Sequence, residues 1–459
     1  MSETTEVIAS SKAPLAELIE EQERIFVERQ PKSGELTARA RRSLAGGTTS
    51  SWQMARPQTV WISHGSGSKI YDVDDNEYVD LHGGYGVGLV GHGHPALVRA
   101  LSERAPLGTH FAQPTDDAII VAEELARRFD QPLWRFTNSG TESTLDAFHL
   151  MRCATGRDVV LKVEGCYHGH HDSAMVSVAN EADEIGPVER PRSPQAGSGL
   201  PVATTDLTWI VHYNDLEIVE RLLVGNPGRI AGMILEPIMM NAGIIGPQDG
   251  YLAGLKDLLH RHGALLTFDE VKTGLTVGPG GATRRLGVTP DLVTLAKAIG
   301  GGVPCGAIGG SEAVMGLIVE REYEQVGTFN GNPLTMAACR AVLTEILDED
   351  AHARVESVRE HMQRGVEAII EEYGLDAHVM AFGAKGCVTF SAEPISNYRG
   401  FLEIDGDLSH LHCLVQHNGG VFLPPWGKSE QWTLSIQHTS EDAQLFVDNF
   451  RSFAQALQH

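Results

Sequence analysis

The spacing of apolar side chains changes along this chain, and each spacing predicts a different kind of element. In residues 15–29 apolar side chains recur every three or four positions, which predicts an amphipathic helix. Two short strand-like runs, 70–73 and 77–81, flank the sequence Asp-Asp-Asn and predict a β-hairpin. The glycine-rich stretch 83–93 follows, and we expect it to be flexible up to a helix at 96–104.

From about residue 115 to 340, short apolar runs alternate with helical segments. This alternation is typical of stacked βαβ units around a mostly parallel sheet, and therefore of an α/β protein. One unit is clear in the strand 233–235, the helix 251–262 and the strand 264–268. Residues 180–201 are rich in acidic residues, Pro, Gly and Ser, and predict a long surface loop. That loop is either an insertion without function or a lid over a substrate site.

After about residue 345 the pattern becomes mixed. Residues 349–373 and 440–457 predict helices, whereas 387–390 and 432–436 predict short strands. This mixture suggests a separate α+β domain at the C-terminal end.

Composition narrows the class of protein. The 459 residues are 42% hydrophobic and 21% charged, as in an ordinary globular enzyme. A net charge of −24 argues against a nucleic-acid or anionic-membrane partner, because both would repel it. The six cysteines form no C-x-x-C pair and are expected to be reduced thiols. With no secretion signal and no membrane-spanning run, we expect a cytoplasmic protein.

A turn between a predicted strand and a predicted helix is the first candidate for chemistry. The strand 133–136 passes into the helix 141–154 through Asn-Ser-Gly-Thr-Glu-Ser, where Ser139 and Glu142 have the spacing of a capping box. A helix that opens through glycine exposes backbone N–H groups and the positive end of its dipole, which favours a phosphate. Many helices begin this way with nothing bound, so the turn predicts a phosphate site only together with the residues that follow.

An aromatic residue and three histidines come after the apolar run 159–163. Tyr167 is placed at a strand end, where its ring can stack on a cofactor ring. His168, His170 and His171 resemble part of a metal cluster, but no Cys, Asp or Glu set completes it. We therefore predict no metal site, and expect His168 to be a hydrogen-bonded histidine near the active site.

Asp269 and Lys297 are the most informative pair. Each closes an apolar strand-like run, and the roughly 28 residues between them leave room for one helical crossover. Because the strands of open α/β sheets bind ligands at their carboxyl ends, both side chains are expected to meet there. A carboxylate keeps the nitrogen of pyridoxal phosphate protonated, and an amine holds its aldehyde covalently. The competing Lys272 is expected not to reach a ring held by Asp269.

With these residues assembled, the chain resembles a class III aminotransferase, a fold-type-I pyridoxal phosphate enzyme. The resemblance covers roughly residues 35–455. It is carried by motifs in the family's order and spacing: 138–142, 167–169, Glu236-Pro237, 268–271, Ala296-Lys297 with the glycines after it, and 327–333.

The resemblance implies an architecture, a cofactor and an assembly. The cofactor is pyridoxal 5'-phosphate, and the expected partners are small amines and keto acids and a second copy of the chain in a homodimer with shared active sites. A large domain with a mostly parallel seven-stranded sheet is joined by a small α+β domain built from both ends of the chain. The expected boundaries are 1–95 for the N-terminal part of the small domain, 96–340 for the large domain and 341–459 for the C-terminal part.

The resemblance also implies roles for single residues. Tyr167 and Val271 would lie on opposite faces of the cofactor ring, and Thr328 would reach the phosphate from the neighbouring subunit. Glu236 and Asn214 match family positions near the site. The residues implied to hold the phosphate are Ser139, Gly140 and Thr141.

The substrate-facing segments resemble those of glutamate-1-semialdehyde aminomutases and β-amino-acid aminotransferases, but they depart from both. Gln53 and Trp426 stand where these relatives are expected to carry arginines that hold a substrate carboxylate, and Trp52 lies beside Gln53. Either the pocket is more apolar, or another arginine such as Arg56 binds the carboxylate. We expect a ping-pong aminotransferase for an amine or β-amino acid with a bulky apolar group; the alternative is the aminomutase, an isomerase.

Overall fold

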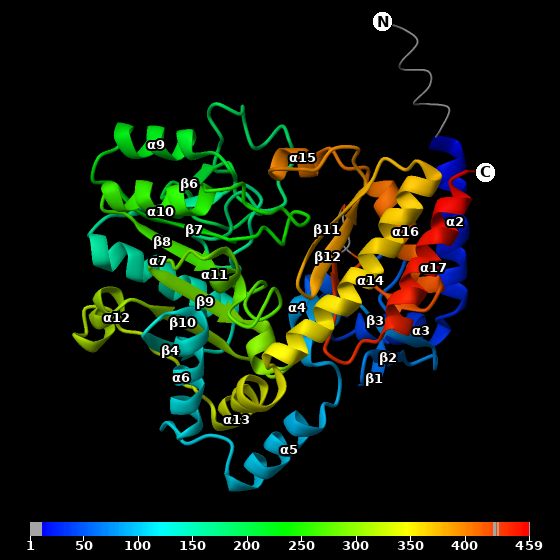
Figure 1. Cartoon of the computed structure of the whole chain (residues 1–459), viewed down its shortest axis with the longest axis horizontal. Coiled ribbons are helices and arrows are strands. Elements are labelled where there is room, and N and C mark those ends of the chain that lie inside the picture. The colour runs from blue at the N-terminus through cyan, green and yellow to red at the C-terminus, as the bar shows by residue number, and fades with distance from the viewer. Residues whose placement is uncertain (1–11, 426–427, 429–430, 459) are drawn as a thin grey trace, which may run out of the picture.

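A seven-stranded sheet forms the centre of the computed structural model, which describes residues 12–425, 428 and 431–458 (Figure 1). The strand order is β4-β10-β9-β8-β7-β5-β6, and only β10 runs antiparallel to its neighbours. The predicted α/β class with a mostly parallel seven-stranded sheet is therefore confirmed. The strands are β4 (Leu133–Thr137), β5 (Val159–Val163), β6 (Thr208–Val211), β7 (Ile230–Leu235), β8 (Leu265–Asp269), β9 (Leu292–Ala296) and β10 (Gly306–Gly310).

Helices cover both faces of this sheet. Val160 of β5 belongs to a buried cluster with Phe148 of α7, whereas its neighbour Leu161 belongs to a second cluster with Leu255 of α10. Successive side chains of a strand point to opposite faces, so α7 and α10 lie on opposite sides. The helices of this region are α5 (Pro95–Arg104), α6 (Asp117–Phe129), α7 (Gly140–Thr155), α8 (Val202–Thr205), α9 (Leu216–Gly225), α10 (Tyr251–Arg261), α11 (Gly281–Leu286), α12 (Glu312–Val319) and α13 (Pro333–Ala341).

Two smaller sheets lie beside the large one. The first has the order β1-β2-β3-β13, and its parallel β3–β13 pair joins an N-terminal to a C-terminal segment. The predicted hairpin is β2 and β3, and the second small sheet is antiparallel. The strands are β1 (Ile62–Ser66), β2 (Lys69–Asp72), β3 (Glu77–Asp80), β11 (His378–Phe382), β12 (Lys385–Thr389), β13 (Val421–Phe422) and β14 (Gln431–Thr433).

The two ends of the chain pack together. Helix α2 lies against α16, and α14 lies against α17, so the N-terminal and C-terminal helices share one side of the molecule (right in Figure 1). None of the described helices combines the length and hydrophobicity that a bilayer crossing requires. The helices here are α2 (Lys12–Glu28), α3 (Pro31–Ala40), α14 (Glu349–Tyr373), α15 (Tyr398–Leu402), α16 (Gly406–Asn418) and α17 (Ser440–Ala456).

Three segments test the sequence-based expectations at finer scale. The glycine-rich stretch expected to be flexible forms α4 (Gly83–Gly86) and a 3-10 turn, η3 (Gly88–Val90), with buried side chains. The strand expected at 432–436 ends at Thr433, although its continuation still bonds neighbouring backbone. Residues 180–201 contain no helix or strand, as predicted.

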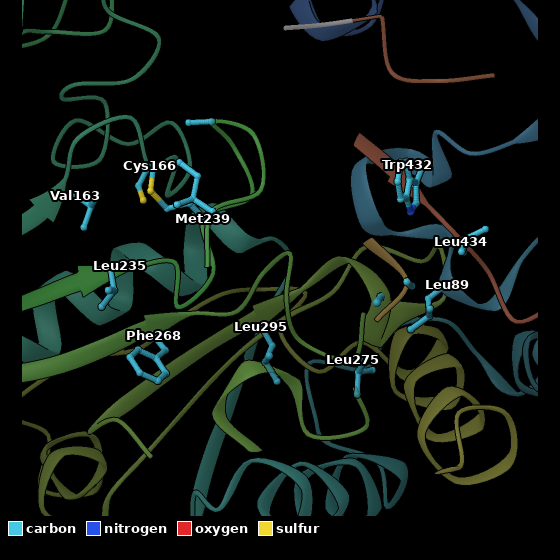
Figure 2. Close-up of a cluster of buried hydrophobic side chains, with 14 of the residues drawn as sticks. Leu89, Val163, Cys166, Leu235, Met239, Phe268, Leu275, Leu295, Trp432 and Leu434 are labelled. Atoms are coloured by element: carbon cyan, nitrogen blue, oxygen red, sulfur yellow. The ribbon is translucent and has the colours of Figure 1, made fainter. Parts of the chain in front are cut away.

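The apolar core runs continuously from the large sheet to the C-terminal strands. Figure 2 shows Phe268 and Leu295 on neighbouring strands of the sheet, with Trp432 and Leu434 towards the C-terminal part and Leu275 between. All of these side chains are fully buried. Burial on this scale fixes the sheet against the small sheets, and the functional groups lie where these parts meet.

Candidate active site

The main cavity opens at the carboxyl ends of β8 and β9, beside the first turn of α7. Its volume is about 780 Å³. This is the edge of an α/β sheet where ligands bind. Its lining includes most of the residues predicted from the sequence: Trp52, Ser139, Gly140, Thr141, Tyr167, His168, Glu236, Asp269, Val271 and Lys297.

Asp269 is a buried carboxylate held in place by three donors. Its Oδ2 lies 2.7 Å from Nδ1 of His168, so that nitrogen carries a proton and donates it. Its Oδ1 accepts hydrogen bonds from the Val271 N–H at 2.9 Å and the Thr294 hydroxyl at 3.2 Å. Thr294 reaches it because the two residues are paired across β8 and β9. The predicted hydrogen-bonded histidine is thus present, and it orients Asp269.

Lys297 follows β9 directly and begins the 3-10 turn η5 (Lys297–Gly300). Its φ of 52° lies in the left-handed region, which residues other than glycine rarely adopt. The residues that do adopt it are often found at active sites. Burial lowers the pKa of its amine, although the nearby Asp269 and Glu236 oppose the shift. A lowered pKa leaves more of the amine neutral and nucleophilic.

The first turn of α7 forms a narrow backbone cradle. The Ser139 Oγ caps the helix by accepting the Glu142 N–H at 3.3 Å. The predicted capping box is only half formed, because the Glu142 carboxylate accepts the Asn138 N–H at 2.6 Å and not that of Ser139. A Cβ on Gly140 would lie 2.9 Å from Val271, so only a glycine lets the backbone approach this closely. The free N–H groups of the first turn suit a phosphate.

Tyr167 is fixed through Glu236. The Glu236 carboxylate accepts the Tyr167 backbone N–H at 3.1 Å, the Met240 N–H at 2.7 Å and the Asn241 side chain at 2.8 Å. The ring of Trp52, from the short 3-10 turn η2 (Ser51–Gln53), meets the Tyr167 ring edge-on at 5.3 Å. Glu236 therefore acts on the site by holding the turn that carries Tyr167.

A second cavity of about 300 Å³ continues from the first. The two share Trp52, Tyr167, Asn241, Lys272 and Lys297. The second adds mostly apolar and aromatic walls from distant parts of the chain, among them Tyr85, Met240, Tyr398, Phe401 and Pro424. Val178 and Ala179, just before the 180–201 loop, also line it.

Lys272 lines both cavities together with Lys297. That it does not reach a ring held by Asp269 stays a prediction. The Lys272 Nζ donates a hydrogen bond to the Met240 carbonyl at 2.8 Å. The turn after β8 bends the chain back along the cavity wall, which the apolar run before Asp269 could not reveal. Sequence reasoning also missed Lys385, because nothing near that residue indicates a site.

Two residues predicted to contact the substrate, Asn214 and Arg56, line neither cavity. Asn214 uses its side-chain amide to bond the Gly246 and Ser396 carbonyls and the Gln248 N–H, which gives it a structural position. Arg56 is largely exposed and pairs with the Glu23 carboxylate at 2.8 Å. Trp426 lies outside the described residues.

Thr328 is exposed and lies in a different cavity, formed with residues 110–114 and 325–333. The structure therefore does not bring it to the cavity of its own chain. Within the described residues, no three His, Cys, Asp or Glu side chains are arranged to hold a metal ion.

Sheet topology, the Asp269–Lys297 pair and the glycine cradle together define the class of fold-type-I pyridoxal phosphate enzymes. The family model described as "Aminotransferase class-III" matches residues 52–450, and the chain belongs to that family. It is 37% identical over 390 residues to a glutamate-1-semialdehyde 2,1-aminomutase of Natranaerobius thermophilus, covering 84% of this chain and 89% of that one.

Solved structures agree with this assignment. An omega-transaminase from Sphaerobacter thermophilus has a TM-score of 0.89 and 30% identity, covering 94% of this chain and 100% of that one. A variant of the Pseudomonas aeruginosa PAO1 glutamate-1-semialdehyde aminomutase in complex with PMP has a TM-score of 0.89 and 29% identity, covering 97% and 99%. The protein is therefore an enzyme, and its cofactor is pyridoxal phosphate.

Proposed function

We propose that this enzyme is a transaminase that moves an amino group between an amine or β-amino acid and a keto acid by ping-pong chemistry. The single observation that carries the proposal is one cavity that brings together the Lys297 amine, the Asp269 carboxylate and the open first turn of α7. A panel of amines and keto acids tested against the purified, coenzyme-loaded protein checks it. Absence of transfer from every donor to every acceptor would reject it.

The residues of the cavity fit the cofactor. The N–H groups of Gly140 and Thr141 would hold its phosphate, with the Ser139 and Thr141 hydroxyls beside them. Asp269 would face the pyridine nitrogen, and Tyr167 and Val271 would lie on the two ring faces. When bound, pyridoxal phosphate withdraws electrons from the bond that is broken at the substrate carbon.

The chain's own residues then have separate tasks. Asp269 is held in position for the pyridine nitrogen, since three donors fix both of its oxygens. The Nζ of Lys297 takes the proton from the substrate carbon and later returns one. Trp52 and Tyr167 form an aromatic wall that limits the access of water to that amine.

A homodimer would complete the site. Thr328 of the partner subunit is proposed to contact the phosphate. Its exposure and its distance from the cavity of its own chain support this role. Val326 and Phe329 beside it are 79% and 58% exposed, as expected for side chains that a partner covers.

The cytoplasmic location stays a prediction, supported by the lack of any disulfide among the six cysteines, all of which are described.

The amino donor is proposed to carry a bulky apolar group, because aromatic side chains from four segments wall the second cavity. Mixing donors with the coenzyme-loaded protein and recording its absorbance tests this. A change with glutamate-1-semialdehyde and none with any apolar amine or apolar β-amino acid would contradict it.

The aminomutase reaction is the second candidate, favoured by the name of the Natranaerobius relative. Product analysis without any keto acid separates the two. Turnover of the semialdehyde alone would favour the isomerase, whereas a strict need for an acceptor favours the transaminase.

A further inference from the structure

The second cavity contains an unusual set of charges. Three lysines line it: Lys272 after β8, Lys297 after β9 and Lys385 at the start of β12. None of its described lining residues is acidic, and none of those lining either cavity is an arginine. Lysines are rarely buried unless an anion pairs with them. Lys297 is assigned to the cofactor, and neither of the other two amines forms an ion pair with a described carboxylate.

Each of these two amines has only a neutral acceptor in the described structure. The Nζ of Lys385, which is 1% exposed, donates to the Thr433 hydroxyl at 2.8 Å. That of Lys272 donates to the Met240 carbonyl at 2.8 Å. An ammonium has three protons to donate, so both side chains retain donors for a ligand.

The pKa shifts of the buried groups around this cavity favour the binding of an anion. Burial, followed by repulsion from Lys297, lowers the pKa of Lys272 to about 7, although the Glu236 and Asp269 carboxylates of the first cavity oppose the shift. Burial and repulsion from Lys272 and Lys297 also place the pKa of Lys385 well below its ordinary value. Burial is the main cause that lowers the pKa of the neighbouring His82 to about 4, and both lysines add to it against the opposing Asp80. A bound anion would relieve all three groups.

We propose that Lys272 and Lys385 form a carboxylate-binding subsite in the second cavity, so that the substrate is an amino acid with an apolar group and not a simple amine. This inference rests on the proposed transaminase function. The carboxylate belongs to the amino donor, to the keto-acid acceptor or to both, because in ping-pong chemistry they enter the same site. The lysines would replace arginines as the cationic partners, and the aromatic walls would hold the apolar group.

The test compares two donors that differ only in the carboxylate. The acid is 3-amino-3-phenylpropanoate, and 1-phenylpropan-1-amine carries a methyl group in its place. Wild type, Lys272→Met and Lys385→Met are compared, with pyruvate as acceptor. The matched control is Lys256→Met, which removes a half-buried lysine that also bonds a backbone carbonyl, that of Thr289, away from both cavities. Calorimetry with 3-phenylpropanoate, which has no amino group to react, gives a readout of binding alone.

We expect each cavity variant to lower the acid-to-amine ratio of kcat/KM at least about tenfold, mainly through KM, and to weaken 3-phenylpropanoate binding by a similar factor. A raised KM for pyruvate would assign the subsite to the acceptor as well. Lys272→Arg keeps the charge and should retain most of the preference. Lys256→Met should change neither quantity. Retained coenzyme absorbance confirms that a variant is folded.

An unchanged ratio with unchanged 3-phenylpropanoate binding would overturn the subsite. Loss of bound coenzyme without a change in the ratio would overturn it too, because the lysines would then serve the cofactor. If wild type transfers no amino group from any donor yet binds 3-phenylpropanoate through Lys272, the transaminase proposal fails and the subsite stands.

Discussion

The two connected cavities are built in different ways. The first takes its groups from strand ends and from one helix start, and hydrogen bonds fix its carboxylates Asp269 and Glu236 from several sides. The second is assembled from side chains spread between Trp52 and Gln431, and its amines Lys272 and Lys385 have only neutral partners. The first cavity brings together an amine, a carboxylate and an open helix start, whereas the second has three lysines and no carboxylate among the described residues that line it. We therefore propose that the first cavity sets the reaction class and the second sets the choice of substrate.

The largest effect is expected at the first cavity. Lys297→Ala removes the amine that holds the cofactor and moves the proton, so kcat should fall by at least about 10³-fold. Coenzyme should still bind through the α7 cradle, which equilibrium dialysis measures. The control is Lys256→Ala, with near-normal turnover expected. Activity at the wild-type level in Lys297→Ala would remove the mechanism proposed for this cavity.

A mixed dimer shows whether the first cavity needs two chains. Neither Lys297→Ala nor Thr328→Asp alone should turn over appreciably, since the second variant puts a negative charge beside the phosphate. If Thr328 acts in the partner's site, a heterodimer of the two variants contains one intact site. Its activity should then recover to about half of wild type by simple counting of sites. Differently tagged chains, co-expressed and purified in sequence, provide the measurement. A heterodimer as inactive as its parents would place Thr328 outside the partner's site.

The pH dependence of stability sharpens the contrast for the second cavity. The pKa of Lys272 is lowered from 10.5 to about 7 on folding, so between these values the unfolded chain binds more protons. The free energy of unfolding of the coenzyme-free protein should therefore increase as pH rises from about 7 to 10, by roughly 4 kcal/mol. Lys272→Met should lack that increase. Urea unfolding at pH 7 and pH 9.5 gives the change in the free energy of unfolding with pH for each protein. An equal change in wild type and Lys272→Met would show that the pKa of the Lys272 amine is not lowered.

The smallest effect separates folding from binding at the cradle. Ser139→Ala and Thr439→Ala each remove the N-cap of a helix, α7 and α17 respectively, and each should cost about 1 kcal/mol of stability. Only Ser139→Ala should also weaken coenzyme binding, because Thr439 lies in the complete capping box of a helix that does not line the cavity. Fluorescence titration of coenzyme into both variants gives the comparison. Equal coenzyme affinity in the two would separate Ser139 from the phosphate site.

Local sequence determined much of the fold and the first cavity. The apolar runs that end at Asp269 and Ala296 are buried strands, because a covered parallel sheet requires continuous hydrophobic segments. Adjacent parallel strands end at the same edge, so the meeting of Asp269 with Lys297 could be predicted from order and spacing alone. The turn at Ser139 could also be predicted from the sequence, because a helix start is set by residues within one turn.

Tertiary structure alone decided the rest. No local pattern shows that His168 bonds Asp269, that Asn214 bonds loops away from the cavity, or that Lys272 faces the same space as Lys385. These contacts join segments that are distant in sequence, and they depend on how the sheets pack. Hydrophobic periodicity specifies which face of an element is buried, but it does not specify which distant segment covers that face. For that reason the sequence alone predicted that Asp269 and Lys297 meet, and only the folded chain showed which lysines line the second cavity.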